Sequence, residues 1–177
     1  MNAIDPAAER SARALQYLQE GRSDLAIPLF EEVLASSVRV LGADHPNTLA
    51  SRSNLATAYE SVGRLGEAIP LFEEVLADSL RVLGSDHPGT LTSRNNLAGA
   101  YESAGRIGKA IPLLEGVLAD RLRVLGPDHP DTLASRSNLA GAYYAAGRLG
   151  EAIPLLEGVL ADRLRVLGPD HPDTLAS

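Results

Sequence analysis

The sequence predicts an all-α chain of antiparallel helix pairs stacked side by side, an α-solenoid. Three observations support this prediction: a repeat of 42 residues, apolar side chains at helical spacing inside each repeat, and no run that alternates apolar and polar residues as a strand does. A fixed period of this size is typical of stacked supersecondary units, each of which buries its apolar face against its neighbours.

A phrase and a pattern both return at the 42-residue interval. The phrase Asp-His-Pro returns at residues 44–46, 86–88, 128–130 and 170–172. The pattern Asn-Leu-Ala-x-x-Tyr returns at residues 54–59, 96–101 and 138–143. We therefore expect a single array over residues 1–177. Its expected parts are repeats of about 1–42, 43–84, 85–126 and 127–168, and the start of a further, truncated helix at 169–177.

The first helix of each repeat, helix A, is expected over residues 46–62 in the second repeat, where apolar residues recur at helical spacing. Proline is favoured at the first helical position because its missing N–H needs no partner there. Asp44 or His45 then lies at the N-cap. Gly63 ends the helix, since glycine readily adopts the left-handed conformation that follows a helix.

The second helix, helix B, is expected over about residues 66–83. Pro70 lies near the end of its first turn, where it removes at most one intrahelical bond and bends the helix rather than breaking it. Gly84 ends the helix before the next repeat begins. The expected apolar stripe consists of Ala68, Ile69, Phe72, Val75, Leu76, Leu80 and Leu83.

The overall composition and charge exclude several kinds of partner and site for this chain. The formal net charge of the 177 residues is −7, which argues against a nucleic-acid partner. Cysteine is absent, so disulfides and thiolate metal sites are excluded and a cytoplasmic location is expected. No apolar run approaches the ~18 residues of a membrane span, so we expect no membrane contact.

The histidines, serines and acidic residues form no recognisable catalytic or metal-binding pattern. Neighbouring helix pairs stack ~10 Å apart, whereas two imidazoles that share a zinc ion each lie ~2 Å from it. We therefore interpret the repeating histidines as helix-start residues. No spacing suggests a Ser-His-Asp triad, and no glycine-rich phosphate loop is present. We expect no enzyme activity, no metal and no cofactor.

The order Leu55-Ala56-x-x-Tyr59, Gly63 and Ala68-x-x-x-Phe72 resembles the tetratricopeptide repeat signature in both residues and spacing. The 42-residue length, the Gly-x-Asp-His-Pro-x-Thr-Leu opening and the Asn-Leu-Ala centre are similar to the kinesin-light-chain type of repeat and its bacterial versions. The resemblance covers essentially the whole chain. It implies a right-handed superhelix in which helix A lines a concave groove that binds a protein or peptide.

Carried over residue by residue, the resemblance places small and polar side chains of helix A in the groove. These candidates are Ser53, Asn54, Thr57, Glu60, Asn95, Asn96, Glu102, Ser137 and Asn138. The three asparagines at positions 54, 96 and 138 stand one repeat apart, and a carboxamide can bond a peptide backbone of any sequence. Two interpretations stay open: the asparagines bind ligand, or they bond neighbouring helices and hold the stack in register.

Arg52, Arg94 and Arg136 form a second row on helix A, where many similar repeats carry tryptophan. If they face the groove, they favour ligands that bear carboxylates. If they pack along the helix interface, their guanidinium groups pair with acidic residues of the next repeat. The second interpretation is favoured, because position 52 falls on the apolar stripe of its helix.

Tyr144 is a further candidate for the groove. It replaces Glu60 and Glu102 of the preceding repeats, and an exposed tyrosine is a typical binding anchor. The tyrosines at positions 59, 101 and 143, in contrast, are expected in the core.

The two ends of the array differ. In the first repeat Ala12 and Arg13 replace the asparagine and leucine of the later repeats, which makes this helix more polar, as in a cap that meets solvent. The C-terminal end has no such cap. The apolar residues expected to be exposed there are Leu156, Val159, Leu160 and Leu167. This exposure indicates either a longer array or end-to-end self-association.

We therefore predict a protein-interaction scaffold that binds an extended peptide or a partner helix in the groove. One alternative is a structural, self-associating repeat module. Another is a regulatory sensor segment of a larger signalling protein, with catalysis elsewhere.

Overall fold

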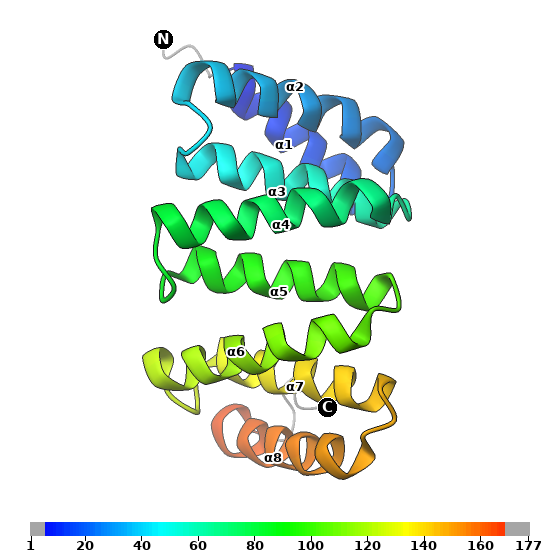
Figure 1. Cartoon of the computed structure of the whole chain (residues 1–177), viewed down its shortest axis with the longest axis vertical. Helices are drawn as coiled ribbons and strands as arrows, with labels where there is room; N and C mark the ends of the chain where they lie inside the picture. Colours follow the sequence, from blue (N-terminus) through cyan, green and yellow to red (C-terminus); the bar gives the residue numbers. More distant parts are fainter. Residues whose placement is uncertain (1–5, 169–177) are drawn as a thin grey trace. The chain divides into compact units, whose positions relative to one another are not determined.

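The computed structural model describes residues 6–168, and over that range it contains eight α-helices and no strand (Figure 1). The helices are α1 (Pro6–Gln19), α2 (Ser23–Leu41), α3 (Pro46–Ser61), α4 (Leu65–Val82), α5 (Pro88–Ser103), α6 (Ile107–Leu125), α7 (Pro130–Ala145) and α8 (Leu149–Leu167). Odd-numbered helices are the helix A of their repeats and even-numbered helices are the helix B. The all-α prediction is confirmed. The expected further helix at 169–177 lies outside the described residues.

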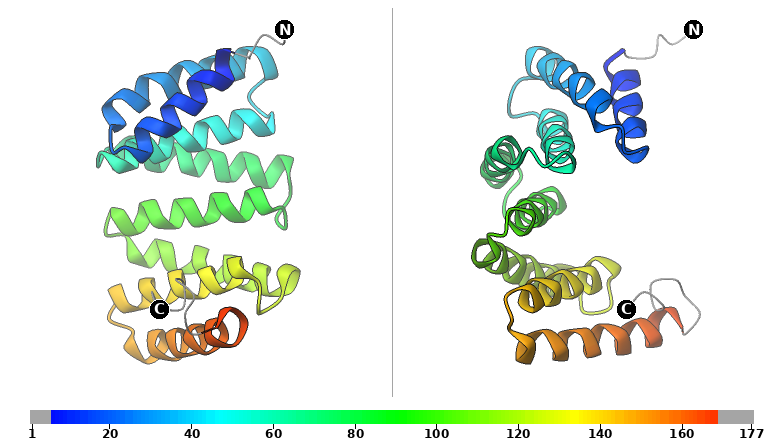
Figure 2. Two further views of the ribbon diagram at one scale, coloured as in Figure 1. Left: turned by 180° about the vertical axis from the view of Figure 1, so that it is seen from behind. Right: turned by 90° about the vertical axis from the view of Figure 1, so that its right-hand side faces the viewer.

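The chain divides into two compact units, Met1–Ser103 and Ala104–Ser177. In the first unit α2 packs on α1 and α3, and α4 packs on α3 and α5. Helices α1, α3 and α5 therefore form one layer, the A layer, and α2 and α4 form the other, the B layer (Figure 2). In the second unit α7 packs on both α6 and α8. The single array over 1–177 stays a prediction.

The described helices A of the later repeats begin at the proline of the Asp-His-Pro phrase. His45 caps α3, because its Nδ1 accepts a hydrogen bond from the backbone N–H of Asn47 at 3.1 Å. His87 and His129 make the same bond with the residue two positions on, at 3.0 and 3.2 Å. Each bond satisfies an N–H group that the helix start leaves without a partner. The interpretation of these histidines as helix-start residues is confirmed.

The helix ends also follow the sequence closely. Gly63 has a φ of +76°, so it takes the left-handed conformation expected after helix A. Helix B starts one residue earlier than predicted and continues unbroken through Pro70. The proline is tolerated because it removes only one bond near the helix start.

The core is formed mainly by aliphatic side chains, with one tyrosine in each helix A from the second repeat onward. Tyr59, Tyr101 and Tyr143 are 9%, 7% and 8% exposed, as expected of core residues. The predicted stripe of α4 is wrong at Leu80, which is 40% exposed, whereas Ser79 beside it is 2% exposed. Ser79 faces α5, where its hydroxyl lies 3.2 Å from that of Ser93, and Leu80, the next residue, lies on a more exposed part of the helix.

One expectation for the last helix is also wrong. Val159 is 1% exposed, because it lies on the covered face of α8, which packs on α7. Leu156 and Leu160 are 45% and 40% exposed, as predicted. The structure does not describe the side chain of Leu167.

Candidate functional site

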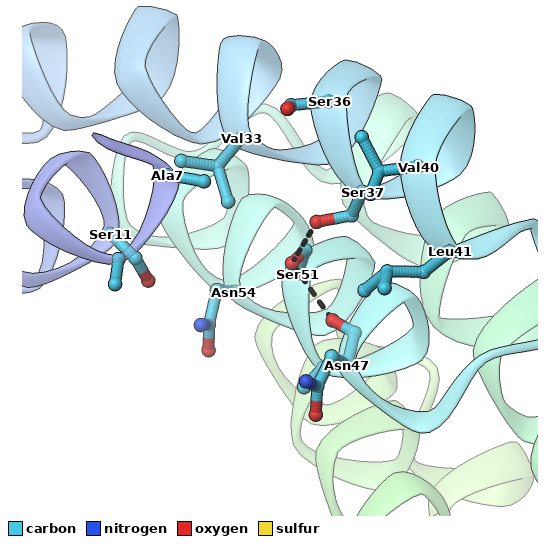
Figure 3. A pocket seen from close by; sticks show the side chains of 12 residues that line it. Ala7, Ser11, Val33, Ser36, Ser37, Val40, Leu41, Asn47, Ser51 and Asn54 are labelled. Carbon is cyan, nitrogen blue, oxygen red and sulfur yellow. Dashed lines mark hydrogen bonds between the residues drawn. The ribbon is translucent and has the colours of Figure 1, made fainter. Parts of the chain in front are cut away.

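Two pockets open in the first unit, one repeat apart. The first, of about 340 Å³, lies among α1, α2 and α3 (Figure 3), and the second, of about 360 Å³, lies among α3, α4 and α5. Both volumes are at the lower end of the range of ligand pockets. The pockets are built alike, from residue pairs 42 positions apart: Ser11 and Ser53, Val33 and Val75, Ser37 and Ser79, Leu41 and Leu83, Asn54 and Asn96.

The lining of both pockets is small and uncharged. No aspartate, glutamate, lysine or arginine belongs to it within the described part of the chain, and His87 is its one titratable side chain. Aliphatic side chains provide an apolar wall, and serine and asparagine provide hydrogen-bonding groups. Such a surface accepts apolar or small neutral groups and places no demand on the charge of a ligand.

The serines in the first pocket are tied to one another. Ser51 donates its hydroxyl to the carbonyl of Asn47 at 2.9 Å, so Ser37, 3.3 Å away, is the donor toward Ser51 (Figure 3). In the second pocket Ser93 and Ser79 repeat this arrangement. These bonds fix each helix B on the next helix A and hold the pocket walls in place.

The asparagine row behaves in two ways. Asn96 donates its Nδ2–H to the Ser53 hydroxyl at 3.3 Å, which ties α5 to α3. Asn54 lines both pockets, and its carboxamide has no hydrogen-bond partner within residues 6–168. It projects from α3 at the edge of the first pocket (Figure 3). The row thus contains one asparagine that bonds a neighbouring helix A and one whose carboxamide has no hydrogen-bond partner within residues 6–168.

Other candidates on helix A lie outside the pocket lining. Thr57 donates its hydroxyl to the carbonyl of Ser53 at 3.0 Å, within its own helix. Glu60 accepts a hydrogen bond from the Ser103 hydroxyl at 2.8 Å, which joins α3 to α5. Glu102 and Asn95 are half-buried on α5, and burial raises the pKa of the Glu102 carboxyl.

Two members of the arginine row, Arg52 and Arg136, are directed at helix B rather than at the pockets. Arg52 donates to Asp78 of α4 at 2.7 Å, and Arg136 makes the same bond to Asp162 of α8. The expected acidic partner is therefore in the same repeat, not in the next one, because the antiparallel hairpin places these positions side by side. Arg94, the third member of the row, is half-buried.

The second unit carries the remaining candidates on α7. Tyr144 is 69% exposed, as expected of a binding anchor, and Asn138 is also exposed. Ser137 donates to the carbonyl of Leu133 in its own helix at 3.2 Å. Their roles as ligand contacts stay predictions.

Sequence reasoning missed a ladder of tyrosine and glutamate. Tyr59 donates its hydroxyl to Glu31 at 2.7 Å, and Tyr101 donates to Glu73 at 2.5 Å. Tyr143 does the same with Glu115 at 2.7 Å. The bond to Glu31 is the main reason why the pKa of Tyr59 is raised. A constant offset of 28 residues between glutamate and tyrosine was the signal in the sequence.

No three histidine or acidic side chains within residues 6–168 come together in a way that could hold a metal ion. None of the described helices is both long enough and apolar enough to cross a membrane.

Sequence profiles described as tetratricopeptide repeat match residues 7–79, 60–122 and 132–173. No curated protein gives a sequence match. Among solved structures, the nearly identical TPR-like repeats of a Podosopora anserina protein assigned as a kinesin light chain are 39% identical to this chain. That comparison covers 98% of this chain and 83% of the other, with a TM-score of 0.86.

Two more distant structures share the fold. BtubC from P. vanneervenii is 24% identical, over 97% of this chain and 69% of its own, with a TM-score of 0.81. A Rap protein, solved in complex with Competence and Sporulation Factor, is 11% identical, over 98% of this chain and 52% of its own, with a TM-score of 0.74.

The stacked helix pairs define a repeat scaffold of the protein-interaction class. The chain belongs to the tetratricopeptide repeat family, and its repeats are of the kinesin-light-chain-like type.

Proposed function

We propose that the A layer of the first unit binds an extended peptide segment of a protein partner. The observation that supports this function is the pair of equivalent pockets one repeat apart, with Asn54 at both. The apolar walls of the pockets can receive side chains of the peptide, and the carboxamide of Asn54 can hydrogen-bond its backbone.

The spacing of the pockets suggests the form of the ligand. Packed helices lie 8–10 Å apart, roughly the distance between equivalent points on α3 and α5. A polyproline II segment advances ~3.1 Å per residue and presents every third side chain on the same face, which gives ~9 Å. Two small apolar side chains three residues apart would thus reach both pockets. The Rap complex with Competence and Sporulation Factor shows that a protein of this fold binds a partner, and it supports a binding role here.

The test uses Ala50, an exposed residue that lines both pockets. A random-peptide display library is selected on the immobilised full chain, and binding of the selected peptides is measured by calorimetry. We expect Ala50→Trp to weaken binding at least tenfold without lowering the melting temperature, because Ala50 is exposed and its bulky replacement would obstruct the lining that the two pockets share. Glu74→Ala, an exposed change in the B layer, is the control and leaves binding intact. Peptides that bind Ala50→Trp as well as the wild type would refute the proposal.

The same peptides separate the two interpretations of the asparagine row. Asn54→Ala removes an open carboxamide, so it should weaken binding about fivefold, the equivalent of one hydrogen bond of ~1 kcal/mol, with unchanged stability. Asn96→Ala removes the bond to Ser53, so it should lower the melting temperature. The regulatory-segment alternative and the cytoplasmic location stay predictions.

A further inference from the structure

The two equivalent pockets of the first unit differ at one edge. His87 belongs to the lining of the second pocket, but its equivalent His45 does not belong to the lining of the first. Next to His87 the second pocket has Gly89, and the residue in the same place in the first pocket is Asn47. His87 is exposed, whereas His45 is half-buried. The second pocket therefore presents an imidazole that the first pocket does not.

The absence of a side chain at position 89 shapes this edge of the second pocket. A Cβ added to Gly89 would lie 3.1 Å from Nδ1 of His87 and 3.2 Å from Cδ1 of Leu83, so both neighbours would have to move slightly. Both neighbours belong to the lining of the pocket. A side chain at position 89 would thus stand against the imidazole, and glycine leaves the ring uncovered there.

The imidazole of His87 supplies a hydrogen-bond donor to the second pocket. Its Nδ1 accepts the backbone N–H of Gly89 at 3.0 Å, and this bond assigns the proton of the neutral ring to Nε2. The Nε2–H group has no hydrogen-bond partner in the part of the chain that the structure describes. One ring nitrogen thus fixes the side chain at the start of α5, and the other is available to a ligand.

Asn96 supplies an acceptor to the same pocket. Its Nδ2–H donates to Ser53 at 3.3 Å, and its Oδ1 has no partner among the described helices. The pocket thus combines a donor and an acceptor with the apolar walls of Val75 and Leu83. A ligand carboxamide satisfies both groups, because it accepts through its oxygen and donates through its nitrogen. A carboxylate has no donor, and no lysine or arginine in the lining would compensate for its lost hydration.

We propose that the second pocket binds an asparagine or glutamine side chain of the peptide, whereas the first pocket binds a small apolar side chain. This inference rests on the proposed function, since it refines the ligand of one of the two pockets. The carbonyl oxygen of the ligand carboxamide accepts the Nε2–H of His87, and its N–H donates to Oδ1 of Asn96. Because the two pockets select different side chains, the order of these side chains in the peptide fixes the direction in which it binds.

Peptides selected from the display library on the full chain test the proposal. They should carry asparagine or glutamine at one of two positions three residues apart, and a small apolar residue at the other. Leucine has nearly the shape of asparagine without its polar groups. Replacement of the selected asparagine by leucine should therefore weaken binding by at least about fivefold, the effect of one neutral hydrogen bond.

Variants of the chain assign this preference to the imidazole. His87→Ser removes the ring but keeps a capping side chain, since serine is also favoured at the N-cap. It should weaken binding of the asparagine peptide about fivefold and leave its leucine analogue and the melting temperature unchanged. His45→Ser, the same change at a cap outside both linings, is the control. Gly89→Asn gives the second pocket the residue of the first and should reduce the preference for asparagine over leucine.

The outcomes separate this inference from the function on which it rests. Selected peptides that carry apolar residues at both positions, and that bind His87→Ser as tightly as the wild type, would overturn the inference and leave the proposed function standing. An aspartate analogue that binds more tightly than the asparagine peptide would also overturn the assignment of a carboxamide. A library that yields no binder would overturn both proposals.

Discussion

The threonine of the repeat opening shows how one residue type keeps one role. Thr48, Thr90 and Thr132 are 0% exposed. Each donates its hydroxyl to a backbone carbonyl at the end of the preceding helix B, at 2.8, 3.2 and 3.4 Å. Each bond gives the buried threonine hydroxyl a partner, without which its burial would be costly.

Gly116 departs from the pattern of the earlier repeats, and its effect on the free energy of unfolding can be measured. The earlier repeats have glutamate there, and an added Cβ at Gly116 meets nothing within 4 Å. Gly116→Ala should therefore raise the free energy of unfolding by about 1 kcal/mol, because alanine loses less backbone entropy in a helix. Denaturant unfolding measures it. Gly63→Ala is the contrasting variant, since its φ of +76° makes alanine unfavourable there by about 1 kcal/mol. A neutral or destabilising effect of Gly116→Ala would contradict this account.

At the scale of elements, a charged clamp joins the ends of the two helices in one hairpin. Arg81, in the last turn of α4, donates to Asp44 ahead of α3 at 2.5 and 2.9 Å and to Asp78 at 2.9 Å. Asp78 also accepts from Arg52. The hydrogen bonds from Arg81 are the main cause that holds the pKa of both carboxyl groups below their ordinary value of 3.8.

The clamp predicts a dependence of stability on acid pH. A carboxyl group whose pKa is lower in the folded chain stabilises the fold above its unfolded pKa, and this contribution is lost as the pH falls through the lower value. Arg81→Gln should therefore lower the melting temperature at about pH 7 and lower it by less at about pH 3, below the ordinary carboxyl pKa. Arg39→Gln is the matched control, since the positions equivalent to Asp44 and Asp78 hold Asn2 and Ser36. An effect of Arg81→Gln that is equal at both pH values would contradict the clamp.

At the scale of the whole molecule, equivalent residues make equivalent contacts in successive repeats. The bond from helix B to the next helix A joins Ser37 to Ser51 and Ser79 to Ser93 in the same way. A chain built like this has a stability that is close to a sum of repeats and their interfaces.

Removal of residues 43–84 tests this additivity. The deletion joins α2 to α5 and brings Ser37 to Ser93 and Glu31 to Tyr101, pairs of the same residue types as those lost. The shortened chain should keep its helical content per residue and lose about 30 kcal/mol of calorimetric unfolding enthalpy, at ~0.7 kcal/mol for each residue removed. Deletion of residues 43–64, which removes one helix only, is the control and should abolish cooperative unfolding. Loss of cooperativity in the whole-repeat deletion would show that the repeats are not interchangeable.

Local rules were enough to place the elements. Helix α3 begins at the predicted proline and ends within one residue of the predicted position before Gly63. This agreement arises because helix caps depend on the few residues around them. The expectation for Val159 was wrong because an apolar residue of helix B can face either helix A of its own repeat or helix A of the following repeat. The spacing of apolar residues along helix B does not say which of the two it faces. The partner of Arg52 was placed one repeat too far for a similar reason.

The sequence by itself determined the helices, their order and the role of the phrases that begin and end them, since these follow from periodicity and from contacts over a few residues. The tertiary structure alone decided which polar groups meet. The bond of Tyr59 to Glu31 and the position of the Asn54 carboxamide at both pockets depend on how one helix is turned against the next. That rotation is set by the packing of whole side-chain surfaces, and no spacing along a single helix records it.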